Sequence, residues 1–248
     1  MRERMISFYE ELQDRTRKRF ALLVDPDKYD DTSLDHMIGL IKENPPDLLL
    51  VGGSILFKPI DITITVLKLG TSVPVFIFPG NPLQLSDRAD GIFFLSLISG
   101  RNPDFLIGNH VLAAPHLDRA GIEVIPTGYM LMENGRSTSV EYMSNSKPIP
   151  LGKTDIAVAT AMAGEMLGLK CIYLEAGSGA EHTVDLTMIK AIRRKLSLPL
   201  IVGGGITTTR TAEQIYGAGA DMIVVGTAVE KKPDLVKNFT ALRNKMNG

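Results

Sequence analysis

The chain has 248 residues, of which 44% are hydrophobic and 22% are charged, and its formal net charge is −1. A globular chain of this size buries a core without disulfides or structural metals. The near-zero charge excludes global electrostatic steering to nucleic acid or to an anionic membrane.

The first predicted element is a helix over about residues 4–18. This segment carries charges throughout and lacks the apolar core of a signal peptide. It ends in Arg15, Arg17, Lys18 and Arg19, which we interpret as a solvated helix end, where positive charge suits the helix dipole. No stretch of the chain approaches the roughly 18 apolar residues of a membrane span. With one cysteine in the whole chain, these features predict a cytoplasmic protein with at most peripheral membrane contact.

Eight short apolar runs follow, and most of them end in Gly, Asp or Pro. Segments with helical spacing of apolar residues separate most of the runs, and Leu34, Met37, Ile38 and Ile41 are one example. This alternation predicts parallel strands joined by helical crossovers. The runs are Phe20–Asp25, Leu48–Gly53, Val73–Pro79, Gly91–Leu97, Glu123–Leu131, Cys171–Gly177, Leu200–Gly205 and Met222–Gly226.

The number of runs favours a closed barrel over a doubly wound open sheet, which also alternates strands and helices. One (β/α)₈ barrel takes roughly 250 residues, and the near-continuous apolar strands fit a sheet that is buried on both faces. The segment 47–54 also resembles the segment 221–228, as in a barrel built from repeated units. We therefore predict an α/β fold: a single TIM barrel over residues 1–248 with an additional N-terminal helix.

Asp25 ends the first strand, at the mouth where βα-loops build the active sites of such barrels. A carboxylate there has two natural roles, general base or ligand of a hard cation. Ser54 ends the neighbouring second strand and places a hydroxyl at the same side, although a helix cap also explains this serine. An Asp and a hydroxyl leave most Mg²⁺ positions to water and substrate phosphate, as is common for that ion.

Residues 133–153 form a long connection after the fifth strand, rich in Ser, Asn, Gly and Pro. A loop of this length is unusual in a compact domain and is often an active-site lid. Because it rises from the catalytic face of the barrel, we predict a lid, with an inert surface excursion as the alternative.

Glu175 is the one carboxylate at the end of the otherwise apolar sixth strand. Burial in the barrel mouth would raise its pKa toward the range useful for a general base, whereas a structural salt bridge is the alternative role. The histidines have no metal-binding spacing, and we interpret them as surface or packing residues; they are His36, His110, His116 and His182.

Glycines end the seventh and eighth strands, and they let backbone N–H groups approach an anion closely. A following helix N-terminus adds its dipole, and phosphate sites of many barrels lie at these two strand ends. Gly204 and Gly226 therefore predict a bound phosphate ester. Helix-capping hydroxyls that can assist follow at Thr207, Thr208 and Thr209.

Together these residues resemble the geranylgeranylglyceryl phosphate synthase family, and the match extends from Asp25 to Thr227. The most specific part is the block YLEAGSG at Tyr173–Gly179. The other matching blocks are LVDPDK at Leu23–Lys28, GGS at Gly52–Ser54, PTGYML with the later GRSTSVEYMSNSKPIP, VGGGI at Val202–Ile206 and VGTAVE at Val225–Glu230.

The resemblance implies a Mg²⁺-dependent prenyltransferase that joins a prenyl diphosphate to sn-glycerol 1-phosphate and forms the first ether bond of an ether phospholipid. Asp25 and Ser54 would bind Mg²⁺. The interpretation of Glu175 as a general base agrees with this reaction, since Glu175 would deprotonate the C3 hydroxyl of the acceptor. The family also implies a homo-oligomer, without deciding between dimer and hexamer. The residues that would hold glycerol phosphate are Tyr173, Leu174, Glu175, Ala176, Gly177, Ser178, Gly179, Gly204, Gly205, Gly226 and Thr227.

The expected donor is the C20 geranylgeranyl diphosphate, because relatives that use a longer chain carry a lysine where this chain has Leu23. A heptaprenyl donor is the alternative. The tail needs an apolar groove, and core packing explains any single candidate at least as well. The candidates are Phe93, Phe94, Leu95, Tyr129 and Leu131.

Two other functions fit parts of the sequence. Another phosphate-binding barrel enzyme, such as a phosphosugar isomerase or lyase, explains the glycines of the last two strands but not the YLEAGSG block. A non-catalytic phosphoester-binding barrel would have no use for Asp25 and Glu175.

Overall fold

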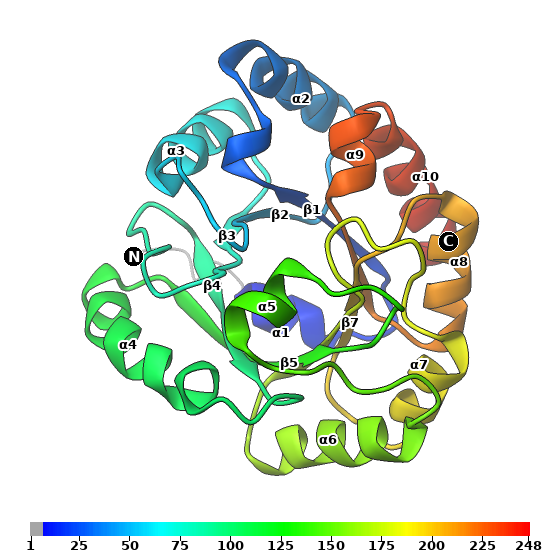
Figure 1. The fold of residues 1–248 in the computed structure, drawn as a ribbon. Coiled ribbons are helices and arrows are strands. Elements are labelled where there is room, and N and C mark those ends of the chain that lie inside the picture. The colour runs from blue at the N-terminus through cyan, green and yellow to red at the C-terminus, as the bar shows by residue number, and fades with distance from the viewer. Residues whose placement is uncertain (1–6) are drawn as a thin grey trace.

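The computed structural model describes residues 7–248, and its strands form one closed parallel barrel. Neighbouring strands follow chain order, and the last pairs with the first, which confirms the predicted TIM barrel. Figure 1 looks onto the barrel with its helices around it. The strands are β1 (Arg19–Val24), β2 (Leu48–Val51), β3 (Val75–Ile77), β4 (Gly91–Leu97), β5 (Glu123–Leu131), β6 (Cys171–Glu175), β7 (Leu200–Gly203) and β8 (Met222–Val225).

The predicted strands lie where the structure has them, but most end earlier than predicted. β4 and β5 have the predicted bounds, whereas β1, for example, ends at Val24 and β7 at Gly203. The residues that the prediction added are mainly Gly, Asp and Pro at carboxyl ends. They leave the sheet because they begin the loops that build the mouth of the barrel.

Helices cover the barrel after every strand except β3 (Figure 1). Residues 78–90 join β3 to β4 without a helix, and Pro79, Gly80 and Pro82 near the start of this connection disfavour one. Within residues 7–248, no helix is both long and apolar enough to cross a membrane. The covering helices are α2 (Asp31–Glu43), α3 (Ile60–Gly70), α4 (Asn109–Ala120), α6 (Thr154–Met166), α7 (Leu186–Arg193), α8 (Thr209–Ala218) and α10 (Leu235–Asn247).

Apolar side chains alternate between the barrel interior and the layer beneath the helices. Leu48 and Leu50 of β2 point into the interior, while Leu49 and Val51 pack under the helices. All four side chains are fully buried. This two-sided burial is why the strands read as continuous apolar runs.

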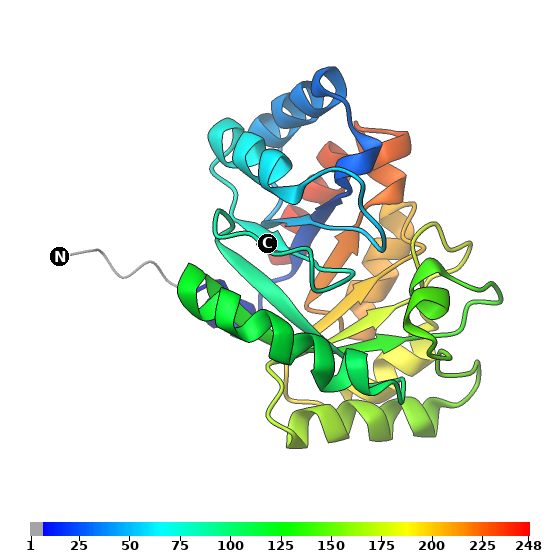
Figure 2. The ribbon, with the colours of Figure 1, turned by 60° about the vertical axis from the view of Figure 1, so that its left-hand side comes forward.

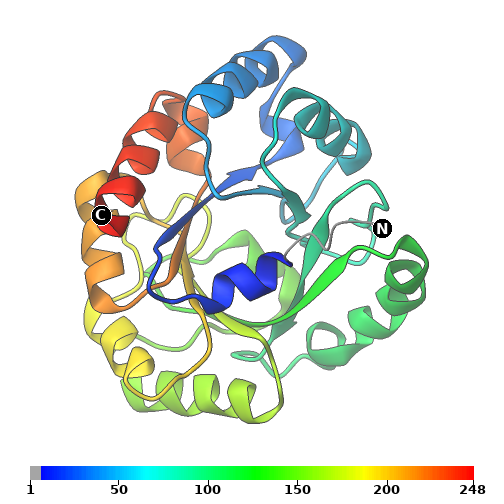
Figure 3. The ribbon, with the colours of Figure 1, turned by 180° about the vertical axis from the view of Figure 1, so that it is seen from behind.

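A short helix, α1 (Phe8–Gln13), closes the amino-terminal end of the barrel, as Figure 3 shows from behind. Its Phe8 and Leu12 are buried in the same cluster as the inward-facing strand residues. Glu123 of β5 anchors the helix, because its carboxylate accepts from the backbone N of Phe8 and of Tyr9, both at 2.9 Å. The helix is shorter than the predicted 4–18, of which residues 4–6 lie outside the described part.

The prediction of a solvated basic helix end after α1 is wrong for Arg19, whereas Arg15 and Arg17 are exposed as predicted. Arg19 belongs to β1 and is only 5% exposed. Its guanidinium satisfies carbonyl groups that the end of α1 and the following turn leave without helical partners. These are the carbonyls of Glu11, Asp14 and Arg17.

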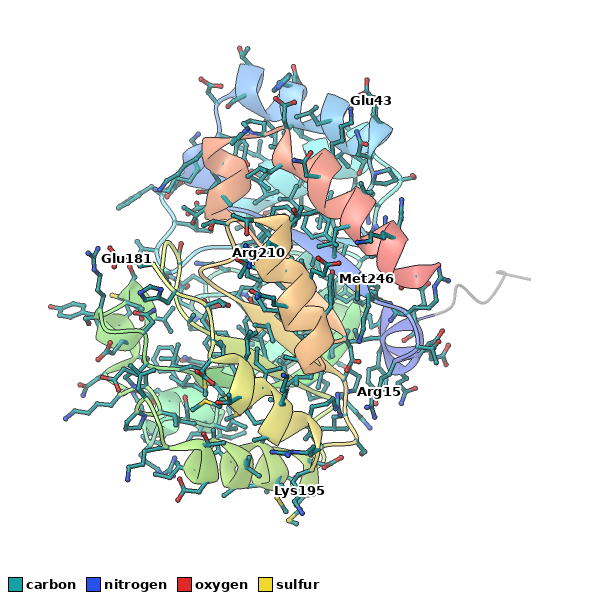
Figure 4. All side chains as sticks on the ribbon, turned by 90° about the vertical axis from the view of Figure 1, so that its right-hand side faces the viewer. Arg15, Glu43, Glu181, Lys195, Arg210 and Met246 are labelled. Carbon is teal, nitrogen blue, oxygen red and sulfur yellow. The ribbon has the colours of Figure 1, made fainter. Side chains whose placement is uncertain are left out.

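Two more residues of that basic cluster face a buried acid at the same end of the barrel. Arg15 and Lys18 lie 3.8 and 3.9 Å from the carboxylate of Asp221, which also pairs with Arg193 at 2.9 Å. Figure 4 shows Arg15 at the opposite end of the molecule from Glu181. Arg15 and Lys18 thus add positive charge around Asp221 while Arg15 stays exposed to solvent.

Candidate active site

The carboxyl ends of the strands gather the residues that the sequence singled out. Asp25 directly follows β1, Glu175 ends β6 and Gly226 directly follows β8. Because the strands are parallel, these ends and their loops meet at one mouth, seen from the side in Figure 2.

Asp25 presents a carboxylate at this mouth, and none of the ion pairs in residues 7–248 includes it. Its Oδ1 accepts from the backbone N of Asp27 at 3.0 Å, at the start of η1 (Pro26–Lys28). Its Oδ2 faces Gly53, where an added Cβ would lie 3.2 Å away. Burial raises the pKa of Asp25, although the bond from Asp27 and the charge of Lys28 act in the other direction.

Ser54 follows Gly53 at the same rim and lines an apolar groove. It caps no helix, because α3 begins at Ile60 after an N-cap at Pro59. In the described part of the chain, no three His, Cys, Asp or Glu side chains cluster as metal ligands. Asp25 and Ser54 thus offer oxygen donors of the kind that fits Mg²⁺, which keeps water and substrate oxygens in its remaining positions.

Glu175 is a buried carboxylate with hydrogen bonds but no countercharge. It is 7% exposed and is absent from the ion pairs of residues 7–248. Its Oε1 accepts from the backbone N of Gly177 at 2.6 Å, and the hydroxyls of Tyr129 and Tyr173 donate to the carboxylate. Burial raises the pKa of Glu175 to about 7, although the three hydrogen bonds act to lower it. A pKa near neutrality suits a general base.

Aromatic rings form a floor beneath Glu175. Tyr129 and Tyr173 are register partners on β5 and β6, and their ring centroids lie 5.3 Å apart. The ring of Phe78 lies 5.1 Å from that of Tyr173. Gly203 leaves room for the Tyr173 hydroxyl, with which any added Cβ would collide. The floor closes the lower side of the site with apolar surface.

The YLEAGSG block faces the site only in part. Tyr173 points into the barrel interior, whereas Leu174 and Ala176 are buried in the outer layer beneath the helices. These two residues can therefore reach a ligand only through backbone groups.

Gly204 allows the end of β7 to approach Glu175. Its φ of +81° is a conformation that side chains disfavour, and an added Cβ would lie 2.6 Å from Glu175 Oε1 and from the Gly177 N. Gly205 is packed as closely, with an added Cβ 2.5 Å from the carbonyl oxygen of His182. Both glycines thus hold the loops after β6 and β7 together.

Hydroxyl groups from two loops meet at the mouth. Ser178 Oγ lies 3.2 Å from Thr227 Oγ1, and Gly226 and Thr227 begin the short helix α9 (Thr227–Lys231). The space around Gly179 is open. Thr208 caps α8, as predicted, by accepting from the backbone N of Thr211. Hydroxyls and backbone N–H groups gathered in this way are suited to an anion such as a phosphate.

The segment 133–153 contains the helix α5 (Ser139–Ser144) and lies over the barrel mouth in Figure 1. Asn134 donates to the carbonyl of Ala176, and Arg136 pairs with Glu181 at 2.6 Å. The segment therefore contacts the YLEAGSG block directly. Its opening and closing as a lid stays a prediction.

An apolar groove with about 870 Å³ of empty space, part of it open to solvent, begins at the mouth beside Ser54. It lies between residues 78–85 and the segment formed by η2 (Asp104–Gly108) and α4, where the barrel lacks a helix. Of the predicted lining residues, Phe94, Leu95 and Tyr129 line it, whereas Phe93 and Leu131 are buried in the barrel interior. Further lining residues include Phe78, Leu85, Phe105, Ala113, Val140 and Met143.

Two residues near the site were not among the predicted site residues: His110, interpreted as a surface or packing residue, and Glu230. His110 lines the groove wall; its Nε2 lies 3.0 Å from Ser96 Oγ, its ring meets Phe94 edge-on, and burial lowers its pKa. Burial, and then the charge of Asp25, raise the pKa of Glu230 in α9. Neither residue lies at a strand end, so the rule that located the other site residues could not find them.

The chain is similar to known proteins over nearly its whole length. The model of the PcrB family matches residues 13–243. The geranylgeranylglyceryl phosphate synthase of Spirosoma linguale is 47% identical over 233 residues, 93% of each chain. That of Flavobacterium johnsoniae is 49% identical over 221 residues, 89% of this chain and 91% of the relative.

A solved structure has the same fold over the full length. It is the crystal structure of (S)-3-O-geranylgeranylglyceryl phosphate synthase from Thermoplasma acidophilum in complex with its substrate sn-glycerol-1-phosphate. The TM-score is 0.90 at 30% sequence identity, and the match covers 98% of each chain.

Proposed function

This chain belongs to the PcrB family and is a prenyltransferase; on that premise we propose that it transfers a geranylgeranyl group from its diphosphate to the C3 hydroxyl of sn-glycerol 1-phosphate, with Mg²⁺. The observation that carries the chemistry is Glu175, an unpaired buried carboxylate with a pKa of about 7. Family membership argues against the two other functions that fitted parts of the sequence.

The acceptor is held by its phosphate at the loops after β6, β7 and β8. Ser178, Thr227 and the backbone N–H groups that follow Gly204 and Gly226 supply the donors, and the short distance between the two hydroxyls supports a shared anion. A phosphate fixed there leaves the glycerol hydroxyls to reach toward Glu175. The likeness to the structure solved with sn-glycerol-1-phosphate supports this acceptor.

The donor's tail lies in the apolar groove, and its diphosphate lies at the rim beside Asp25 and Ser54. These two residues would hold Mg²⁺, which supplies charge neutralisation for a departing diphosphate. The C20 donor rests on Leu23, which packs in the barrel cluster against Gly226 where longer-chain relatives carry lysine.

The reaction replaces one C–O bond by another. The acceptor's C3 oxygen bonds to C1 of the prenyl chain, the bond from C1 to the diphosphate oxygen breaks, and the diphosphate leaves with the bonding electrons. Glu175 takes the proton from the attacking hydroxyl. The aromatic floor and the segment 133–153 exclude water, which would otherwise capture the allylic carbon.

A product analysis tests this function. The enzyme would be incubated with Mg²⁺, sn-glycerol 1-phosphate and, separately, C15, C20 and C35 prenyl diphosphates, and products identified by mass spectrometry. We expect the C20 ether as the main product. A dominant C35 ether would show that the preferred donor is heptaprenyl diphosphate. The absence of an ether product with every donor would overturn the proposal.

The metal site needs its own test. Asp25→Asn should lose most activity while folding normally, and Ser54→Ala should lose less because water substitutes for a neutral ligand. The circular dichroism spectrum serves as the folding control. Wild-type turnover and unchanged Mg²⁺ dependence in Asp25→Asn would refute the assignment.

We also propose that the chain forms a homo-oligomer. Ile107, Val111 and Leu112 project from one stretch of η2 and α4 and are 61%, 63% and 64% exposed. Contiguous exposed apolar side chains of this kind mark interaction surfaces. Light scattering coupled to size-exclusion chromatography should give a mass above 27.0 kDa, and a monomer would contradict the proposal.

A further inference from the structure

A second cavity continues the direction of the apolar groove along α4. It has about 640 Å³ of empty space, part of it open to solvent. Both cavities lie between the helix-free connection 78–90 and α4. The second cavity is lined by Leu85, Ser86, Asp87, His116, Leu117, Arg119 and Ala120.

The two cavities are consecutive along α4. The groove contacts α4 at Asn109, His110 and Ala113, and the second cavity contacts it at His116, Leu117 and Ala120. At 1.5 Å per residue, these two stretches of the helix adjoin each other within one turn. Leu85 is the one residue of the described chain that lines both cavities.

Ser86, His116 and Arg119, three of the four polar side chains of the second cavity, are engaged with their own neighbours. The Ser86 hydroxyl donates to Asp61, and Arg119 bonds to the carbonyl of Pro115 and to His116. Leu85 and Leu117, both packed against the core, form its inner wall. This wall therefore offers apolar surface in continuation of the groove, while Asp87 and His116 are exposed at the outside.

We propose that Leu85 closes the end of the donor groove and thereby sets the longest prenyl chain that the enzyme accepts. The inference rests on the proposed function, since it treats the groove as the site of the donor's tail. The side chain of Leu85 separates the groove from a space that a longer tail would otherwise enter. It is a specificity residue and takes no part in the chemistry.

Substitutions at Leu85 should move donor selectivity in opposite directions. Leu85→Ala joins the two cavities, so the ratio of kcat/KM for the C35 donor to that for the C20 donor should rise by at least about tenfold, as expected where even one methylene changes selectivity 10- to 200-fold. Leu85→Phe fills the groove end, so preference should move from the C20 donor toward the C15 donor. Leu83→Ala is the matched control, because Leu83 is on the same segment, is 91% exposed and lines neither cavity.

The measurement is steady-state kinetics with each donor at saturating acceptor. Unchanged selectivity in folded Leu85→Ala and Leu85→Phe would overturn the inference, as would an equal change in Leu83→Ala. If Leu85→Ala does not fold, Leu85→Val shortens the same side chain by less and must change selectivity in the same direction. A wild-type enzyme that transfers none of the three donors would refute the proposed function instead, so the two failures are distinguishable.

Discussion

Glu175 shows how one side chain acquires a chemical role from its surroundings. A carboxylate in water is too weak a base to deprotonate an alcohol effectively, but burial destabilises its charge and raises the pKa to about 7. The hydrogen bonds from Tyr129, Tyr173 and Gly177 prevent a larger rise. The residue therefore remains partly ionised near neutral pH and is also basic enough to accept a proton.

The first prediction concerns the loss of this base. Glu175→Gln keeps the shape and hydrogen-bonding capacity of the side chain, so kcat should fall by roughly 10²–10⁴-fold with little change in the acceptor KM. Steady-state kinetics on the purified variant measures both values. A near-normal kcat with a raised KM would show that Glu175 only binds the glycerol hydroxyls.

The second prediction concerns pH. A base acts in its ionised form, so kcat/KM should rise as pH increases through about 7 and level off above it. Tyr129→Phe removes a hydrogen bond that lowers the pKa of Glu175. The pH at which kcat/KM reaches half of its plateau should therefore rise by roughly 0.5–1 pH unit, which corresponds to a hydrogen bond worth about 0.5–1.5 kcal/mol. The acceptor's phosphate titrates in the same way with both enzymes. An unchanged midpoint would therefore show that the pH dependence of kcat/KM comes from the substrate and not from Glu175.

A third prediction tests the phosphate anchor. Thr227→Val keeps the size of the side chain but removes its hydroxyl, so the acceptor KM should rise roughly 10- to 100-fold, as for a lost bond to a charged group. The KM of the prenyl diphosphate should stay the same. An unchanged acceptor KM in both Thr227→Val and Ser178→Ala would place the phosphate elsewhere.

Sequence reasoning located Asp25 and Glu175 because a carboxylate at the end of an apolar strand has few structural explanations. It could not find Tyr129 as a hydrogen-bond donor to Glu175, since that contact depends on the register that pairs Tyr129 with Tyr173. Nor could it show that Leu174 points away from the site. Such details depend on pairing between strands, which composition and spacing do not specify.

At the scale of elements, Asp221, directly before β8, connects three other parts of the amino-terminal end of the barrel. Its carboxylate, 2% exposed, accepts from the backbone N of Leu200 at 2.8 Å and pairs with Arg193 at 2.9 Å. Arg15 and Lys18 add positive charge at longer distances. The segment after α1, the end of α7 and the starts of β7 and β8 thus meet at one acid.

The fourth prediction follows from this arrangement. Asp221→Asn leaves Arg193, whose side chain is 13% exposed, without its countercharge, so the free energy of unfolding should fall by about 3–5 kcal/mol. Urea denaturation measures the loss. Glu213→Gln breaks the exposed pair with Lys245 and should cost no more than about 1 kcal/mol, so comparable losses in both variants would contradict the argument.

The connection between β3 and β4 shows where prediction of elements reaches its limit. Strand periodicity and the glycines, prolines and aspartates at strand ends predicted all eight strands. The missing helix became visible only in the structure. Prolines such as Pro79 and Pro82 occur as often in loops that precede a helix as in connections without one, so they do not distinguish the two cases. The same absence creates the groove, so the position of the groove could not be predicted from the sequence either.

At the scale of the whole molecule, the seams of the barrel, where neighbouring strands pair, differ in the number of residues in register. β4 and β5 are in register over seven residues, from Gly91 opposite Glu123 to Leu97 opposite Tyr129. β3 and β4 are in register only where Phe76 meets Gly91 and Ile77 meets Ile92. The shortest seam is thus on the side where no helix covers the barrel.

Local opening costs least where few hydrogen bonds and little packing must be lost. Native-state hydrogen exchange should therefore release the amides of Val75–Ile77 well before those of Ile125–Leu131, and uniform protection around the barrel would contradict this. The barrel thereby separates rigidity from adaptability. The wall of the groove beside the weakest seam can yield locally, while the longer seams keep the catalytic mouth in place.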